Sequence, residues 1–166
     1  HFTFAGYSED LPFVGFNGGW TSKGPYARKH NPWVNFTNIP REANQPLTSF
    51  PKDFRRLPTV SFVIPNLKQD MHDGTIAAGD QWLKKQIDPY VQWSKKHNSL
   101  LIVTWDEDDS SEHNKIPAIF VGPMVKVGQF SQYSSHFSLL RTIEEMYKLA
   151  YAGKSARVEP IKGIWK

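Results

Sequence analysis

The strongest constraint on the fold is a series of three short apolar runs that alternate with helical patterns. The runs cover residues 60–64, 100–105 and 116–121, and their β-branched and aromatic side chains are typical of strands buried on both faces. Residues 77–97 repeat apolar side chains at spacings near three and four, which predicts a helix that Pro89 kinks or divides. This alternation predicts an α/β fold, a layered sandwich with a largely parallel central sheet.

The length of 166 residues predicts a single domain, within which three parts differ in composition. Residues 1–57 are rich in Gly, Pro, Asn and aromatic residues without sustained periodicity, which predicts an irregular, loop-rich segment. Residues 58–149 form the expected α/β core, which ends with an amphipathic helix over about 135–149. We expect residues 150–166 to be a polar, peripheral tail.

Composition excludes several classes of protein. The chain has no cysteine, which excludes a disulfide scaffold and thiol catalysis and leaves metal binding to His and carboxylates. A formal net charge of +4 suits an anionic ligand, but the basic residues are dispersed, so we expect no nucleic acid partner. No apolar run approaches the roughly 18 residues of a membrane helix, so we expect no integral membrane segment. Because the chain begins at His1 without a signal-peptide pattern, we expect a mature form or a fragment.

Acidic and histidine residues follow the predicted strands. In an α/β sheet, ligands bind at the carboxyl ends of the strands. Carboxylate oxygen and imidazole nitrogen are ligands of divalent metals, which activate water or bind phosphoryl oxygen. The residues of this kind that we expect near those strand ends are Asp70, His72, Asp106, Glu107 and His136.

Each of these signals also has a simpler interpretation when it is taken alone. Residues 66–74 could form a solvated turn in which Asp70 caps the next helix. Residues 106–109 could form an exposed acidic loop, and we expect Asp108 and Asp109 to be solvated. A basic loop with Lys29, His30 and Asn31 could receive a phosphate through charge-assisted hydrogen bonds or could simply be solvated. Glu9 and Asp10 add another carboxylate pair.

Taken together and in this order, several segments resemble the phosphoesterase family of bacterial acid phosphatases and non-haemolytic phospholipases C. This family belongs to the alkaline-phosphatase-like superfamily. The likeness extends from about Tyr7 to Leu149, and its most specific motifs are Thr104–Asp108 and His136–Glu144. The segments are Tyr7–Pro12, Lys29–Pro32, Ile64–Asn66 with Asp70–Gly74, Gly79–Leu83, Thr104–Asp108 and His136–Glu144.

The resemblance implies an alkaline-phosphatase-like α/β fold, hydrolysis of phosphate esters at a site with a divalent metal, and a secreted or periplasmic location. It implies that the catalytic residues are His72 and His136. It implies that the residues near the substrate phosphate are Lys29, His30 and Asn31. The metal-binding set that it implies is Asp70, His72, Asp106, Glu107 and His136.

Nothing before Tyr7 matches the part of such enzymes that supplies an early pair of metal ligands and a Ser or Thr nucleophile. We therefore expect a metal-dependent phosphoric ester hydrolase, of the acid phosphatase or phospholipase C type, or the C-terminal part of one that lacks the nucleophile. The fold is then incomplete at its N-terminus. The alternative is a non-catalytic module of the same fold that binds a metal or an anion. The expected partners are a phosphate ester substrate and either the N-terminal portion of the same enzyme or a second copy of the chain.

Overall fold

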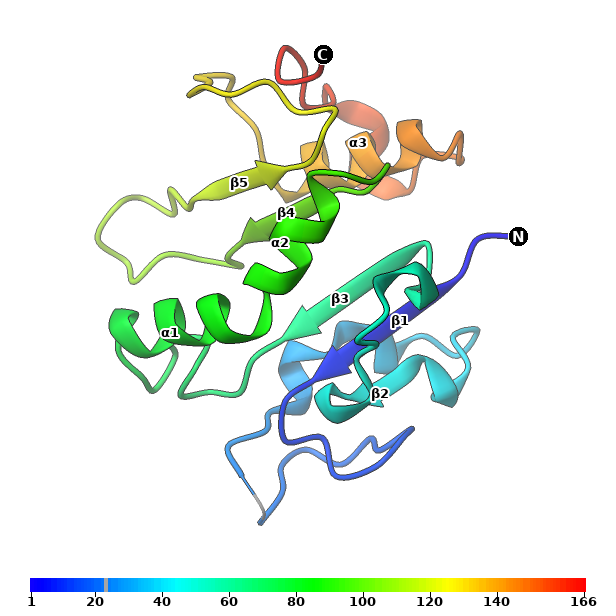
Figure 1. The fold of residues 1–166 in the computed structure, drawn as a ribbon, viewed down its shortest axis with the longest axis vertical. Coiled ribbons are helices and arrows are strands. Elements are labelled where there is room, and N and C mark those ends of the chain that lie inside the picture. Colours follow the sequence, from blue (N-terminus) through cyan, green and yellow to red (C-terminus); the bar gives the residue numbers. More distant parts are fainter. Residues whose placement is uncertain (23) are drawn as a thin grey trace. The chain divides into compact units, whose positions relative to one another are not determined.

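The computed structural model describes residues 1–22 and 24–166, and the chain divides into two compact units, residues 1–90 and 91–166 (Figure 1). The expectation of a single domain is not tested by this division, because compact units also occur within one domain. Among the described residues, no helix has the length and the apolar character needed to cross a bilayer.

The first unit contains a parallel three-stranded sheet with the order β2-β1-β3 (Figure 1). Strand β1 (Phe4–Ser8) lies in the centre, between β2 (Asn44–Pro46) and β3 (Val60–Ile64). The register of β1 and β3 runs from Phe4 opposite Val60 to Ser8 opposite Ile64. Both pairs are parallel, so the expected mixture of helices and parallel strands is confirmed for this unit.

Strand β1 lies inside the segment that we predicted to be loop-rich, and for residues 4–8 that prediction is wrong. The strand has no β-branched residue and has a glycine in the middle, so it lacks the pattern that marks a strand. Gly6 is required by packing, since a Cβ at this position would lie 2.1 Å from Cζ2 of the buried Trp33. Between β1 and β3 the chain otherwise consists mainly of loops and short 3-10 turns, as expected.

After β3, a loop leads to helix α1 (Ile76–Gln86), which is followed by α2 (Asp88–Ser94). The hydroxyl of Thr75 caps α1 by accepting a hydrogen bond of 3.1 Å from the amide of Ala78. The predicted division of the helical segment at Pro89 is confirmed, because Pro89 lies in the first turn of a new helix, where its missing N–H is tolerated.

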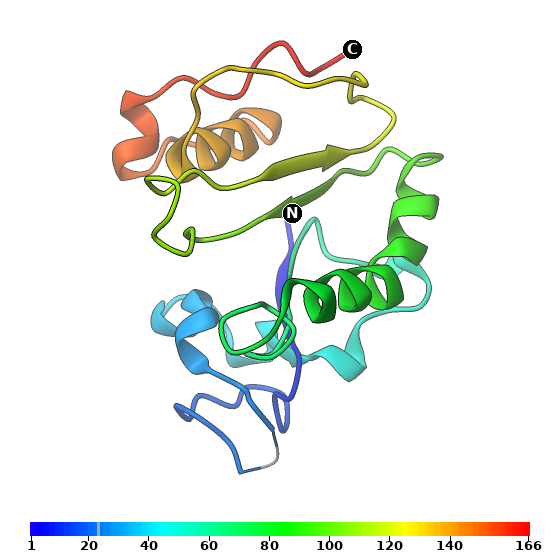
Figure 2. The same cartoon turned by 90° about the vertical axis from the view of Figure 1, so that its left-hand side faces the viewer.

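The second unit contains an antiparallel pair, β4 (Leu101–Thr104) and β5 (Ala118–Val121), together with α3 (His136–Met146) (Figure 2). The expectation of a largely parallel sheet is wrong for this pair. A parallel pair needs a crossover, usually a helix, whereas residues 105–117 form a loop that returns the chain in the opposite direction.

The C-terminal residues pack into the second unit, so the prediction of a peripheral tail is wrong. The 3-10 helix η6 (Gly153–Arg157) lies against α3 (Figure 2). Glu144 of α3 is buried and accepts hydrogen bonds from the hydroxyl of Ser155 at 2.6 Å and the amide of Ala152 at 2.8 Å. Ile161 and Ile164 are also buried.

Replacing Gly6 with Ala is expected to destabilise the chain, because the new methyl group overlaps the ring of Trp33. Overpacking of this kind costs about 1–3 kcal/mol of unfolding free energy. Chemical denaturation measures the loss. The control is Gly19→Ala, because a Cβ at position 19 meets no atom within 4 Å. Equal denaturation midpoints for the two variants would contradict the packing that we assign to Gly6.

Candidate functional site

The candidate site of the first unit lies at the carboxyl ends of β1 and β3. The two strands are parallel, with Ser8 opposite Ile64, so the segments that follow them leave the sheet at the same edge. The amide of Glu9 extends the pairing by donating a hydrogen bond of 2.9 Å to the carbonyl of Ile64. This pairing brings residues 9–10 next to the loop of residues 65–75, a neighbour that the sequence analysis did not predict.

Asn66 organises that loop. Its amide N–H donates to Oε2 of Glu9 at 3.0 Å, and its Nδ2 donates to Oδ2 of Asp10 at 2.8 Å. Its Oδ1 accepts hydrogen bonds from the amides of Lys68 at 3.0 Å and Gln69 at 3.1 Å. The carboxylate pair that stands out in the sequence therefore has a structural role, which is to hold the loop that follows β3.

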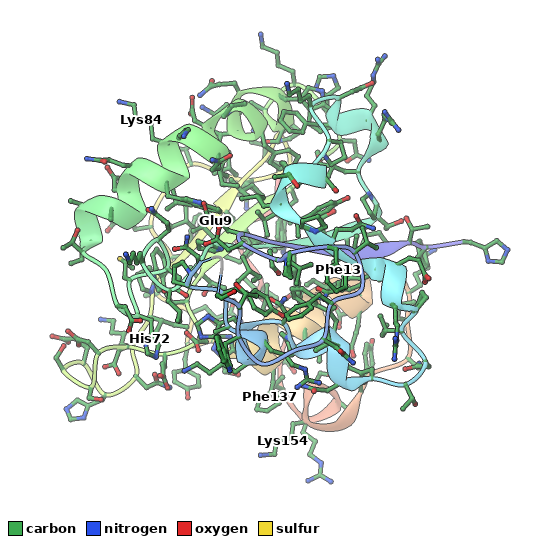
Figure 3. The ribbon with its side chains drawn as sticks, turned by 90° about the horizontal axis from the view of Figure 1, so that it is seen from below. Glu9, Phe13, His72, Lys84, Phe137 and Lys154 are labelled. Carbon is green, nitrogen blue, oxygen red and sulfur yellow. The ribbon has the colours of Figure 1, made fainter. Side chains whose placement is uncertain are left out.

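Asp70 and His72 lie on this loop (His72 is labelled in Figure 3). Oδ1 of Asp70 accepts a hydrogen bond of 2.8 Å from the amide of His72. Oδ2 of Asp70 lies 3.0 Å from Nδ1 of His30, but it is a buried oxygen that accepts no aligned hydrogen bond. A buried carboxylate oxygen of this kind favours a positively charged neighbour, which a protonated His30 or a cation can supply.

The ring of His72 lies between a cation and a carboxylate. Its Nε2 is 3.2 Å from Nζ of Lys29, and its Nδ1 is 2.8 Å from Oδ1 of Asp73. An ammonium group only donates hydrogen bonds, so Nε2 is the acceptor, and Nδ1 carries the proton that it donates to Asp73. This network assigns the tautomer of the neutral ring.

A buried polar network holds Lys29 and His30 next to β1. Asn31 is fully buried, and its Oδ1 accepts a hydrogen bond of 2.8 Å from the hydroxyl of Ser8. Its Nδ2 donates to the hydroxyl of Tyr26 at 3.3 Å, and burial raises the pKa of Tyr26. Asn31 thus fixes the basic loop from beneath, and the substrate contact implied by the family resemblance stays a prediction.

The second unit carries the other candidate residues, and Asp106, Glu107 and His136 are all exposed. His136 begins α3, as the sequence predicted, and its Nε2 donates a hydrogen bond of 2.8 Å to the carbonyl of Asp106. The contact joins the start of the loop after β4 to the start of α3.

Asp108 shapes the same loop. Its carboxylate accepts hydrogen bonds from three backbone amides, Glu112 at 2.7 Å, Ser110 at 2.9 Å and Asn114 at 3.0 Å. These bonds, that of Glu112 most strongly, hold the pKa of Asp108 below its ordinary value. The expectation that Asp108 is merely solvated misses this role.

The predicted metal ligands are divided between the units. Within residues 1–22 and 24–166, no group of three His, Asp or Glu side chains is arranged to hold a metal ion. The buried Oδ2 of Asp70 and the neighbouring imidazoles have suitable donor chemistry, but their placement does not form a complete site. The metal and its ligand set therefore stay predictions.

The comparisons with known proteins agree on one family. The model of the Phosphoesterase family matches residues 1–150. A phosphatidylinositol-3-phosphatase of Mycobacterium tuberculosis is 49% identical over 99% of this chain and 55% of its own length. An acid phosphatase of Aspergillus fumigatus is 30% identical over 89% of this chain and 37% of its own length. A phosphate-repressible acid phosphatase of Penicillium chrysogenum is 28% identical over 93% of this chain and 41% of its own length.

These matches confirm the resemblance that the motifs predicted. The chain spans about half the length of the mycobacterial relative and a smaller share of the two fungal ones. No solved structure matches the chain significantly.

Replacing Asn66 with Ala is expected to lower the free energy of unfolding by about 1–3 kcal/mol, because it removes partners of Asp10 and of two loop amides. Denaturant titration measures this change, and NMR shifts of the His72 amide report the altered loop. Asn38→Ala is the control, because Asn38 is an exposed residue of the same unit. A stability of Asn66→Ala equal to that of the control would contradict the role that we assign to Asn66.

Proposed function

Because this chain belongs to the phosphoesterase family, we propose that it carries part of the machinery of a hydrolase that acts on phosphate monoesters. The three relatives described above are named as phosphatases, which supports a phosphoric ester as the substrate. The name of the mycobacterial relative further supports an inositol lipid as the carrier of the phosphate.

The observation that carries the proposal is the contact of 3.2 Å between Lys29 and His72 at the carboxyl ends of β1 and β3. Both side chains are exposed, so a phosphate can reach them. An ammonium group binds phosphoryl oxygen through charge-assisted hydrogen bonds, and an imidazole transfers protons near neutral pH. The pair thus combines anion binding with acid–base chemistry.

We assign the roles of the surrounding residues from their contacts. Lys29 binds the phosphoryl group, which competes with Nε2 of His72 for the ammonium and frees that nitrogen. Oδ1 of Asp73 accepts the hydrogen bond from Nδ1–H and stabilises the ring once Nε2 has taken up a proton from solvent. A water or hydroxyl group forms the new bond to phosphorus, and as the ester P–O bond breaks, Nε2–H gives its proton to the leaving oxygen. Asp70 positions the ring through the amide of His72, and Asn31 positions the basic loop.

The second unit and the metal belong to the same proposal. We propose that catalysis needs a divalent metal, which supplies Lewis acid chemistry when it is bound. This part is supported by the donor types of Asp70, His72, Asp106, Glu107 and His136 alone. The alkaline-phosphatase-like layering and a secreted or periplasmic location also stay predictions from the family resemblance.

Hydrolysis of a chromogenic phosphate monoester by the purified chain, with divalent metal and with chelator, tests the proposal. Lys29→Ala is expected to lower turnover about 100-fold, since it removes one charged donor to the phosphoryl group. His72→Ala is expected to lower it about 100-fold or more. The control is Lys84→Ala, an exposed lysine of α1 (Figure 3).

The outcomes distinguish a hydrolase from a non-catalytic module that binds an anion. Turnover that disappears with chelator and falls in both site variants, but not in Lys84→Ala, supports the hydrolase. Calorimetry then measures binding of inorganic phosphate. Binding that depends on Lys29 without any turnover would favour the non-catalytic, anion-binding module. Equal behaviour of Lys29→Ala and Lys84→Ala in both assays would contradict the site.

A further inference from the structure

We propose that residues 12–22, which we term the aromatic loop, dock this chain on an anionic phospholipid membrane. The docking deepens the proposed function, because it would bring the site to a phosphate that a lipid carries. It rests on the proposed function for this purpose only. Adsorption to the membrane itself is a separate property with its own measurement.

The aromatic loop exposes large apolar side chains. Phe13 is 60% exposed, Val14 is 45% exposed and Trp20 is 75% exposed (Phe13 is labelled in Figure 3). Beneath them, Phe16 packs edge to face on Phe13, with ring centroids 5.3 Å apart, and on the buried Tyr26 at 5.7 Å. The inner side of the loop is therefore anchored in the core, while its outer side is an apolar surface of the kind that marks an interaction site.

The loop is held in this conformation by hydrogen bonds to the rest of the first unit. The amide of Gly15 donates to the carbonyl of Asn44 at 2.8 Å, and Nδ2 of Asn44 donates to the carbonyl of Phe16 at 2.6 Å. The carbonyl of Gly19 accepts a hydrogen bond of 3.1 Å from the amide of Arg28. The exposed side chains are thus presented by an ordered backbone, which reduces the entropy lost on binding.

Cationic side chains lie beside the apolar tip. Arg41 is exposed, and its Cβ is 3.1 Å from the position that a Cβ on Gly15 would occupy. Arg28 is tied to the loop through Gly19 and directs its guanidinium to Oδ1 of Asn35, at 2.8 Å. Within the described part of the chain, neither guanidinium forms an ion pair. Exposed aromatic residues flanked by cations match the two layers of an anionic membrane interface, acyl chains beneath charged headgroups.

Concave surfaces on the same loop strengthen this assignment. Pro12, Phe13, Phe16 and Trp20 line an open groove of about 420 Å³. A smaller pocket of about 200 Å³ has a mixed polar and apolar lining, which includes Gly15 of the loop and Arg41. The groove offers apolar walls to lipid, and the smaller, more polar pocket has Arg41 in its lining, where the guanidinium can meet a headgroup oxygen. The partner that fits these features is an anionic phospholipid surface.

Co-sedimentation with vesicles tests the docking. The probes are vesicles of phosphatidylcholine with phosphatidylserine and vesicles of phosphatidylcholine alone, so that the lipid is not a phosphate monoester substrate. The chain is expected to bind the anionic vesicles more tightly, and added salt is expected to weaken this binding. The double variant Phe13→Ser with Trp20→Ser is expected to lower the partition coefficient about tenfold or more, because two exposed aromatic side chains no longer enter the interface. Arg41→Ala is expected to lower it about fivefold.

The matched control is Tyr133→Ser, which removes a 93% exposed aromatic side chain of the second unit. It is expected to bind vesicles like the unaltered chain. The double variant is expected to keep its binding of inorganic phosphate and a cooperative thermal transition, lowered at most slightly by the lost contact of Phe13 with Phe16. These two measurements separate loss of docking from loss of the site or the fold.

Other outcomes would overturn the docking proposal. Absence of binding to anionic vesicles, or equal binding by the double variant and the unaltered chain, would do so even if monoester hydrolysis were observed. Self-association of the chain that the double variant abolishes would show that a second copy covers the aromatic loop instead. Failure of hydrolysis with intact, loop-dependent vesicle binding would leave the docking standing and remove the proposed function.

Discussion

The parallel pairing of β1 with β3 is the constraint on which the candidate site depends. It joins segments more than 50 residues apart in the chain, and it places the ends of both strands at one sheet edge. Residues 9–10 can therefore meet Asn66, and the loop that Asn66 shapes can present Asp70 and His72 to the basic loop. Without this pairing, the same side chains are scattered over solvated loops, which is the simpler interpretation that each motif allows.

Buried hydrogen bonds in the first unit also hold the loops of the candidate site in place. Beside the buried aromatic side chains, the space next to β1 is filled by amides and hydroxyls that form hydrogen bonds with one another. Asn44 illustrates this, because its Oδ1 accepts from the indole of Trp33 at 2.9 Å and its Nδ2 holds the aromatic loop. Such a network specifies one arrangement of the loops, since each broken hydrogen bond leaves a buried polar group unsatisfied. The strands thus support the candidate site residues and the aromatic loop through one set of contacts.

Elements with a local sequence pattern are predictable from this chain, whereas elements that depend on packing are not. The apolar periodicity after residue 58 predicted β3, α1, α2 and α3, because each element carries its own pattern. It missed β1, which is a strand only because its neighbours pair with it and Trp33 covers Gly6. The sequence motifs indicated Lys29, His30 and the loop of His72 as site residues, and the structure brings them together. The burial of Asn31 was not predictable, because the sequence alone does not distinguish a loop amide that binds substrate from one that binds buried side chains.

The most direct test of this account is an NMR titration of the His72 imidazole nitrogens with inorganic phosphate. In the free chain, the account predicts a proton on Nδ1 and none on Nε2. Phosphate is predicted to shift the His72 signals in a saturable way, and this response is predicted to disappear in Lys29→Ala. His97, which stacks on Trp93 in the second unit, serves as the internal reference. A response of His72 no larger than that of His97, or one that persists without Lys29, would contradict the assignment of this pair as the phosphate site.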